Sequence, residues 1–146
     1  MISTETKAAF DSASQYFAQP IQQFQYFDKY SRFDYAKGRR ETWPETCDRA
    51  VTFLRDLIRV NVPNSAQLAE QVITEAERQS LLNMQALPSM RTIAMAGDAA
   101  SRQNACTFNC SFLPICDTRA YAEALLISMS GCGVGFSVEK KYVDQL

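Results

Sequence analysis

Residues 107–138 read TFNCSFLPICDTRAYAEALLISMSGCGVGFSV, and this stretch decides the fold of the C-terminal part of the chain. Apolar side chains alternate along 107–115, which predicts a β-strand. Apolar residues at helical spacing follow to about Ser130, where Gly131 is a typical C-terminal stop. A second strand is predicted over 134–138. The order strand, helix, strand is a βαβ unit, so a parallel sheet begins here. Two residues can cap the start of this helix: Asp117 and Thr118.

Upstream of this unit, the strongest helix signal starts at Thr42. Thr42-Trp43-Pro44-Glu45 is a capping box, with Glu45 three residues after the cap and proline tolerated in the first turn. The apolar residues that follow lie on one face of a helix: Cys47, Ala50, Val51, Leu54, Leu57 and Ile58. A turn at 62–65 ends this helix and begins another, whose apolar face repeats the pattern: Leu68, Ala69, Val72, Ile73 and Ala76. Two such stripes joined by a short turn predict a helical hairpin.

The remaining segments carry weaker signals. Residues 3–18 predict a weakly patterned helix ended by a proline, and 22–40, rich in aromatic and cationic residues, fits a short helix or an irregular segment equally well. Leu87-Pro88-Ser89-Met90-Arg91 is predicted to be extended or a loop, since a residue before proline avoids the helical region. We therefore expect an α+β chain with a helical region over 1–85 and the start of an α/β domain over 86–146.

The composition excludes several functions. The 146 residues carry 15 Lys and Arg against 16 Asp and Glu, a net charge of −1, which argues against non-specific nucleic-acid binding through clustered cations. The chain has no His, which removes imidazole zinc sites and both Ser-His-Asp and Cys-His catalysis. No stretch reaches the roughly 20 apolar residues that span a bilayer, and the first residues do not resemble a signal peptide. We expect a cytoplasmic protein without a membrane or nucleic-acid partner.

The cysteines form an odd set of five: Cys47, Cys106, Cys110, Cys116 and Cys132. In a reducing compartment they are more often free thiols, or a catalytic pair, than a disulfide framework. A buried free cysteine most often serves as a small apolar side chain. On one strand, Cys106 and Cys110 would share a face roughly 13 Å apart, so a disulfide partner of Cys110 is expected elsewhere. Their CxxxC spacing is not that of a zinc ribbon, so no metal site is expected.

Two further motifs each leave two interpretations open. Gly131-Cys132-Gly133-Val134-Gly135 follows a helix and opens a strand, the reverse of a phosphate-binding loop. It is either a tight turn or a place where glycines let backbone amides approach a small ligand. Lys37-Gly38-Arg39-Arg40 is either a solvated face or a phosphate contact. Trp43 and the aromatic run over 24–35 are interpreted as core or interface packing.

Four blocks of this chain resemble ribonucleotide reductases, particularly the adenosylcobalamin-dependent (class II), monomeric type that reduces ribonucleoside triphosphates. They occur in family order over about residues 24–146: FDKYSR at 27–32 with KGRRETW at 37–43, LPSMR at 87–91, NCSF at 109–112 and GCGVGFSV at 131–138. They are similar to the family's N-terminal segment, its substrate loop, its first barrel strand, and its glycine turn with the second strand. The resemblance implies that 86–146 begins a ten-stranded α/β barrel, of which this chain holds only the first βαβ segment.

The resemblance also implies roles for individual residues. Cys110 matches the redox cysteine that delivers reducing equivalents to the ribose 2′ position and ends in a disulfide with a distant cysteine. Ser89, Asn109 and the backbone around Cys132 and Gly133 match positions that hold the phosphate or the sugar of the substrate. In the family, adenosylcobalamin initiates the reaction, a thiyl radical on another cysteine abstracts the 3′ hydrogen, and thioredoxin-type proteins regenerate the dithiol. The resemblance places no cobalamin contact in this chain.

The family is several times longer than 146 residues. Its radical cysteine, its disulfide partner and its C-terminal shuttle cysteines belong to later sequence, so we expect an N-terminal part of a reductase that acts with the remainder of the reductase chain. The alternative is a non-catalytic nucleotide-binding or assembly fragment of a split or truncated reductase. A small thiol-redox protein is a third, less favoured interpretation because CxxC is absent.

Overall fold

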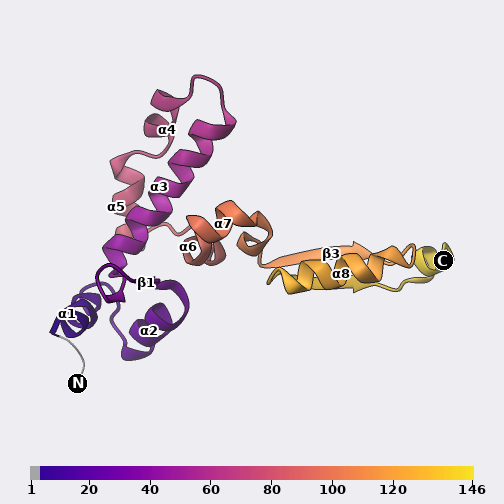
Figure 1. Ribbon diagram of the computed structural model, residues 1–146, viewed down its shortest axis with the longest axis horizontal. Helices are drawn as coiled ribbons and strands as arrows, with labels where there is room; N and C mark the ends of the chain where they lie inside the picture. Colours follow the sequence, from indigo (N-terminus) through magenta and orange to yellow (C-terminus); the bar gives the residue numbers. More distant parts are fainter. Residues whose placement is uncertain (1–3) are drawn as a thin grey trace. The chain divides into compact units, whose positions relative to one another are not determined.

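The computed structural model describes residues 4–146, which form two compact units (Figure 1). The first unit ends at Gly97, and the second covers Asp98–Leu146. The first contains these elements: α1 (Thr4–Ala13), α2 (Pro20–Gln25), the π-helix η1 (Tyr26–Tyr30), β1 (Phe33–Asp34), β2 (Arg39–Arg40), α3 (Trp43–Asn61), α4 (Ala66–Val72), α5 (Glu75–Leu82) and α6 (Met90–Met95). The second contains these: α7 (Asp98–Arg102), the 3-10 helix η2 (Asn104–Thr107), β3 (Cys110–Pro114), α8 (Arg119–Met129), β4 (Gly133–Ser137) and α9 (Lys140–Val143). The expected mixture of helix and sheet is confirmed.

The 19-residue helix α3 organises the first unit. Its start confirms the predicted capping box, because the backbone N–H of Thr42 donates to Oε2 of Glu45 at 2.8 Å. Helices α4 and α5 pack along α3 and together take the place of the second helix of the predicted hairpin (Figure 1). Cys47 and Ala50 of the apolar stripe are fully buried, whereas Leu57 is exposed. Within residues 4–146, no helix is both long and apolar enough to cross a membrane.

The sequence predicts one helix where the structure has two, α4 and α5. Thr74 and Glu77 form a second capping box, in which the Thr74 N–H donates to Glu77 Oε2 at 2.9 Å, and this cap starts a new helix. The Arg55 guanidinium donates bonds of 2.9 and 2.7 Å to the Ile73 carbonyl and so satisfies the backbone at the break. An apolar stripe alone does not reveal such a break, because it continues across both helices.

A buried cluster joins α3 to the N-terminal helices, α5 and α6. Its members are Ala13, Tyr26, Phe27, Trp43, Cys47, Ala50, Val51, Leu81, Ile93 and Ala96. The ring of Trp43 meets the ring of Tyr26 edge-on with centroids 5.6 Å apart, and its Nε1–H donates to the Leu82 carbonyl at 2.9 Å. Burial raises the pKa of the Cys47 thiol to about 12. The packing roles predicted for Trp43 and Cys47 are therefore confirmed.

Segment 22–40 is helical first and then forms a short hairpin. α2 continues directly into η1, whose π turn is closed by the Ser31 N–H donating to the Tyr26 carbonyl at 3.0 Å. Strands β1 and β2 follow and pair antiparallel, with Phe33 opposite Arg40. Neither predicted alternative, a short helix or an irregular segment, describes this segment completely.

Two element boundaries in the first unit differ from the prediction. α1 ends at Ala13, earlier than expected, and the Ser14 hydroxyl there donates to the Asp11 carbonyl at 2.6 Å, a local bond that competes with helix continuation. Met90 begins α6 instead of continuing a loop, because Pro88 restricts the residue before it and not the residues after it.

The first unit also extends beyond the expected domain boundary at residue 85. Arg49 of α3 donates to the carbonyls of Ile93 and Ala96, at 3.0 and 2.9 Å, and so fastens α6 to the first unit. The two compact units consequently divide after Gly97.

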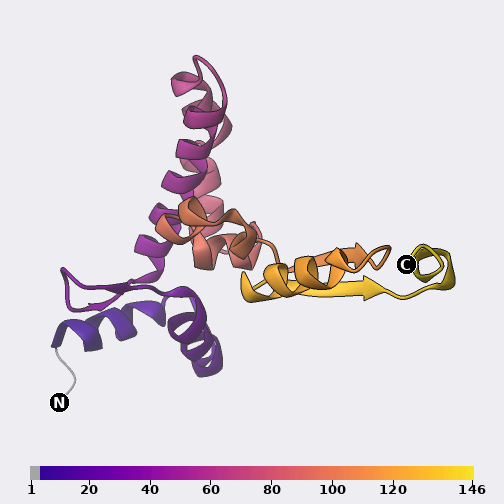
Figure 2. The same cartoon turned by 45° about the vertical axis from the view of Figure 1, so that its right-hand side comes forward.

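The second unit confirms the predicted βαβ order. β3 and β4 are parallel neighbours, and α8, which connects them, runs alongside the strands (Figure 2). The Asp117 carboxylate accepts from the Ala120 N–H at 3.0 Å, so Asp117 rather than Thr118 caps α8. Gly131 ends α8 with a φ of 86°, as its position predicts.

The start of the first strand was predicted too early. β3 begins at Cys110, because 104–107 form the 3-10 helix η2. Cys106 therefore lies outside the strand, and the expected strand spacing between Cys106 and Cys110 does not apply.

Replacing Glu45 by glutamine is expected to lower the stability of the first unit by about 1 kcal/mol at pH 7. The carboxylate accepts from the Arg39 guanidinium at 2.8 and 2.9 Å and from the Thr42 N–H, and the Arg39 contact holds the pKa of Glu45 well below its usual range. Because the pKa of Glu45 is lower in the folded state, its ionised form stabilises the protein at pH values above the unfolded pKa of about 4.3. This stabilisation is lost as the pH falls through the pKa of the folded state.

The measurement is urea unfolding of both proteins at pH 7 and at pH 3, followed by the fluorescence of Trp43. The stability difference should shrink as the pH falls, and Glu5→Gln, which alters an exposed carboxylate of α1, should show little difference at either pH. An equal difference between wild type and Glu45→Gln at both pH values would contradict the assigned role.

Candidate functional site

The parallel strands β3 and β4 carry an open face beside an exposed thiol. Cys110 pairs with Gly133, and Phe112 pairs with Gly135. Paired residues of adjacent strands direct their side chains to the same face of a sheet. Cys110 and Phe112 are exposed, and the two glycines beside them add no side chain. The Cys110 thiol is therefore flanked by bare backbone of β4.

The opposite face of the pair is the better covered one. Near the strand starts Ser111, Leu113 and Val134 are half-buried, and α8 is the helix that packs against these strands; further along, Phe136 on this same face is 59% exposed. The Ser111 hydroxyl donates to the Gly133 carbonyl at 3.2 Å and so joins the two strands on this side. The helix and this bond hold the strand that positions Cys110.

Gly133 lets the two strands start side by side. Its N–H donates to the Asn109 carbonyl at 2.9 Å, and a Cβ at this position would lie only 3.2 Å from that oxygen. Gly135 has more room, because a Cβ there would lie 3.5 Å from the Ser111 carbonyl. A side chain at 133 would press on the neighbouring strand, whereas one at 135 would occupy the open face.

The N–H groups of the glycine turn are already bonded inside the protein. Gly131 donates to the Ser128 carbonyl at 3.0 Å, and Cys132 donates to the Ile127 carbonyl at 3.3 Å. With the bond from Gly133, three consecutive amides of the turn have acceptors. A ligand at this turn would thus meet open surface and carbonyl oxygens rather than these N–H groups.

Four of the five predicted site residues lie together at one end of the strand pair. Cys110 begins β3 directly after Asn109, and Gly133 begins β4 directly after Cys132; parallel strands bring these starts to the same edge. The Cys132 side chain is buried, so this residue can offer only its backbone. Ser89 belongs to the first unit, where it is exposed and immediately precedes α6.

Cys110 is the exposed cysteine among residues 4–146. Cys47 and Cys132 are buried, Cys106 and Cys116 are half-buried, and all five are free thiols. Thiol–disulfide exchange needs a sulfur that a partner can reach, so Cys110 is the best placed of the five for redox chemistry. The part of the chain that the structure describes contains no group of three or more His, Cys, Asp or Glu residues able to hold a metal ion.

Sequence reasoning missed Phe112 and Gly135 as neighbours of the candidate site. Each lies two residues beyond a predicted site residue on the same strand, and residues two apart on a strand share a face. This periodicity is the signal that could have found them.

A family model described as "Ribonucleotide reductase alpha domain" matches residues 4–98. The chain belongs to this family. The match covers the described part of the first unit, whereas the Cys110 site of this reductase-family chain lies in the second unit. Among curated proteins, none matches the chain.

Among solved structures, the chain is similar to one described as the crystal structure of a B-12 dependent (class II) ribonucleotide reductase. The TM-score is 0.71 at 22% sequence identity, and the likeness covers 96% of this chain. The chain spans 23% of the length of that protein. At this identity the likeness concerns the fold, and it supports the resemblance to a reductase that the sequence blocks indicate.

Proposed function

We propose that this chain takes part in ribonucleotide reduction and supplies, through Cys110, one of the two thiols that provide the electrons. One observation carries the proposal: the exposed thiol of a reductase-family chain lies beside two glycines that leave the adjoining surface open. A regular strand holds such a thiol more rigidly than a loop would, which suits a group that must meet one carbon of a sugar.

The reaction consumes one dithiol for each nucleotide. The bond between C2′ and its hydroxyl oxygen breaks, a C2′–H bond forms, and the oxygen leaves as water. Two thiols lose two electrons and two protons and form one disulfide, so atoms and electrons balance. Cys110 is one of these thiols, the other comes from the remainder of the reductase chain, and a thioredoxin-type protein reduces the disulfide again.

The residues around Cys110 contact the substrate, for which a ribonucleoside triphosphate is the favoured class. Asn109 and Gly133 flank the thiol at the strand starts, with the Cys132 backbone beside them. Since the Cys132 and Gly133 N–H groups already have acceptors, the backbone here would accept from sugar hydroxyls through its carbonyls, and a phosphate would need donors from elsewhere. Ser89 presents an exposed hydroxyl and provides a further phosphate contact. The five free thiols suit a cytoplasmic, reducing location.

Adenosylcobalamin is proposed as the cofactor of the complete reductase, because the structurally similar protein is B-12 dependent. The corrin ring of that cofactor supplies ligands to its own cobalt, so the lack of His and of metal-ligand clusters among the described residues neither favours nor opposes its binding, and we assign no cofactor contact to a residue of this chain. We assign radical initiation to no residue of this chain, because in such enzymes the cofactor performs the radical chemistry and the protein binds and orients it.

A single-turnover experiment tests the role of Cys110. A complete reductase that contains this sequence is reduced with a dithiol, freed of reductant and supplied once with substrate and cofactor. Alkylation before and after turnover, read by mass spectrometry, should show Cys110 becoming protected in step with product, whereas the buried Cys47 stays unchanged. Stoichiometric product with Cys110 still fully alkylated would overturn the proposal.

The 146-residue chain alone is expected to form no deoxynucleotide with any nucleotide and reductant. It spans 23% of the similar reductase, and Cys110 is its one exposed cysteine within the described residues. These observations also favour the second candidate function, a non-catalytic assembly or nucleotide-binding part of a reductase. Chromatographic detection of deoxynucleotide formed by the purified chain would contradict the expectation.

A further inference from the structure

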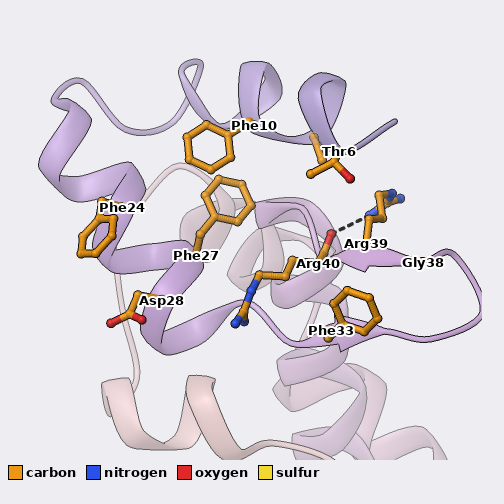
Figure 3. Close-up of a pocket in the computed structure, with 10 residues that line it drawn as sticks. Thr6, Phe10, Phe24, Phe27, Asp28, Phe33, Gly38, Arg39 and Arg40 are labelled. Carbon is orange, nitrogen blue, oxygen red and sulfur yellow. Dashed lines mark hydrogen bonds between the residues drawn. The ribbon is translucent and has the colours of Figure 1, made fainter. Parts of the chain in front are cut away.

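An aromatic cavity of about 410 Å³ lies in the first unit, whereas Cys110 belongs to the second (Figure 3). Small-molecule sites commonly enclose 300–1,000 Å³ and combine apolar walls with a few polar groups. The lining that matters here comes from α1, α2 with η1, and the β1–β2 hairpin: Phe10, Phe24, Phe27, Asp28, Phe33 and Arg40.

Helical spacing brings one wall together. Phe24, Phe27 and Asp28 stand three and four residues apart across the junction of α2 and η1, which places them on one face. The Phe10 ring stacks on the Phe27 ring with centroids 4.4 Å apart and an angle of 11°, so Phe10 backs this wall. The π-helix itself is an uncommon element that occurs frequently at functional sites.

Strand register builds the opposite wall. Phe33 of β1 lies directly opposite Arg40 of β2, so both side chains lie on one face of the hairpin. Figure 3 shows Arg40 reaching along the cavity between Phe27 and Phe33. Phe24 and Phe33 are 61% and 48% exposed, although phenyl rings usually avoid water.

The two cations at positions 39 and 40 differ in how their charges are balanced. Arg39 is neutralised by Glu45 at 2.8 Å. Arg40 donates at 2.6 Å to the uncharged Ser31 carbonyl, and within residues 4–146 it has no carboxylate at ion-pair distance. A guanidinium has five N–H donors, so Arg40 keeps donors and a full charge for an anion.

We propose that this cavity binds a nucleotide. The base stacks on the exposed phenyl rings, which bind any base through its π-face. The phosphate pairs with Arg40, whose planar fork matches phosphate geometry. The Asp28 carboxylate pairs with Lys29 at 2.8 Å and has further lone pairs that accept from a ribose hydroxyl or a base amino group. A purely apolar ligand would leave Arg40 unused, and a small anion would leave the rings unused, so a ligand that carries both parts fits best.

The test is titration calorimetry of the 146-residue chain with AMP, adenosine and inorganic phosphate. AMP should bind saturably with one site per chain, and adenosine and phosphate should each bind at least about tenfold more weakly. Phe24→Ala and Arg40→Gln should each weaken AMP binding at least about tenfold. Matched controls in positions outside the cavity, Tyr121→Ala and Arg59→Gln, should leave the affinity within about twofold.

Photo-cross-linking with 8-azido-AMP gives a second reading that needs no variant. Adducts on residues 24–40 support the proposal, whereas adducts confined to Asp98–Leu146 overturn it. Absence of saturable AMP binding, or binding that neither Phe24→Ala nor Arg40→Gln weakens, also overturns it. The proposal does not depend on the redox role of Cys110, because the residues that line the cavity all belong to the first unit, so this test can be interpreted whichever way the turnover experiment falls.

Discussion

Replacing Cys110 by serine in a complete reductase that contains this sequence is expected to lower multiple turnover by at least about a thousandfold. A hydroxyl cannot give up the electrons that a thiol gives when it enters a disulfide. Substrate affinity should change little, because serine is nearly isosteric and the neighbouring glycines Gly133 and Gly135 are untouched. The measurement is steady-state product formation and substrate affinity with an external dithiol as the reductant.

Cys47→Ser is the matched control for this experiment. Cys47 is fully buried in the first unit and its pKa is raised by burial, so its loss should cost on the order of 1 kcal/mol of stability and leave turnover nearly intact. Full turnover by Cys110→Ser would return Cys110 to an ordinary surface cysteine. Equal loss in both variants would indicate damage to folding instead of loss of a redox group.

Most of the correct predictions rest on local sequence signals. The capping box at Thr42 and the glycine stop at Gly131 act within one or two helical turns, so their outcome depends on few distant residues. The βαβ order followed from the change of apolar period between 107–115 and the helix after it. Each of these elements formed where the sequence placed it, with small shifts at the ends.

Non-local contacts decided what the sequence left open. The division between α4 and α5 is supported by Arg55, which binds the Ile73 carbonyl from another helix. The aromatic cavity needs Phe33 and Arg40 to face each other across a hairpin, and the expectation of a short helix or irregular segment at 22–40 contained no such pairing. The apolar periodicity of a sequence does not predict strand register. It also does not predict which long side chains bond to other elements.

The candidate site shows the same division. Asn109, Cys110, Cys132 and Gly133 were named as site residues from the resemblance, and their roles stay predictions; the parallel register brings all four to one edge. What the amides of the glycine turn do could not be predicted, because their acceptors lie on the preceding helix and on the neighbouring strand. The roles of these residues were inferred from the resemblance to reductases. The parallel register of β3 and β4 explains why the residues are neighbours.

Replacing Arg49 by methionine is expected to destabilise the first unit by about 3–5 kcal/mol, enough to unfold a marginal domain. The Arg49 and Glu41 side chains are only 16% and 14% exposed and pair at 2.9 Å. The same guanidinium donates to the carbonyls of Ile93 and Ala96, which end α6, and to the carbonyl of Tyr30 at 3.3 Å. Its removal leaves a largely buried carboxylate and three carbonyls without this donor, and that desolvation penalty dominates the loss.

Urea unfolding measured by fluorescence tests this prediction on the right unit, because Trp43 is the single tryptophan and lies in the buried cluster with Ile93 and Ala96. Arg49→Lys should lose an intermediate amount, since an ammonium cannot match the planar fork. Arg59→Met is the matched control: Arg59 sits on the same helix, is 40% exposed and pairs at the surface, so its loss should stay within about 1 kcal/mol. The double variant Glu41→Gln/Arg49→Met should recover part of the stability lost in Arg49→Met, because it removes the unpaired charge. A double variant no more stable than Arg49→Met would show that the carboxylate is not the source of the loss, and that Arg49 acts through the backbone carbonyls that it binds.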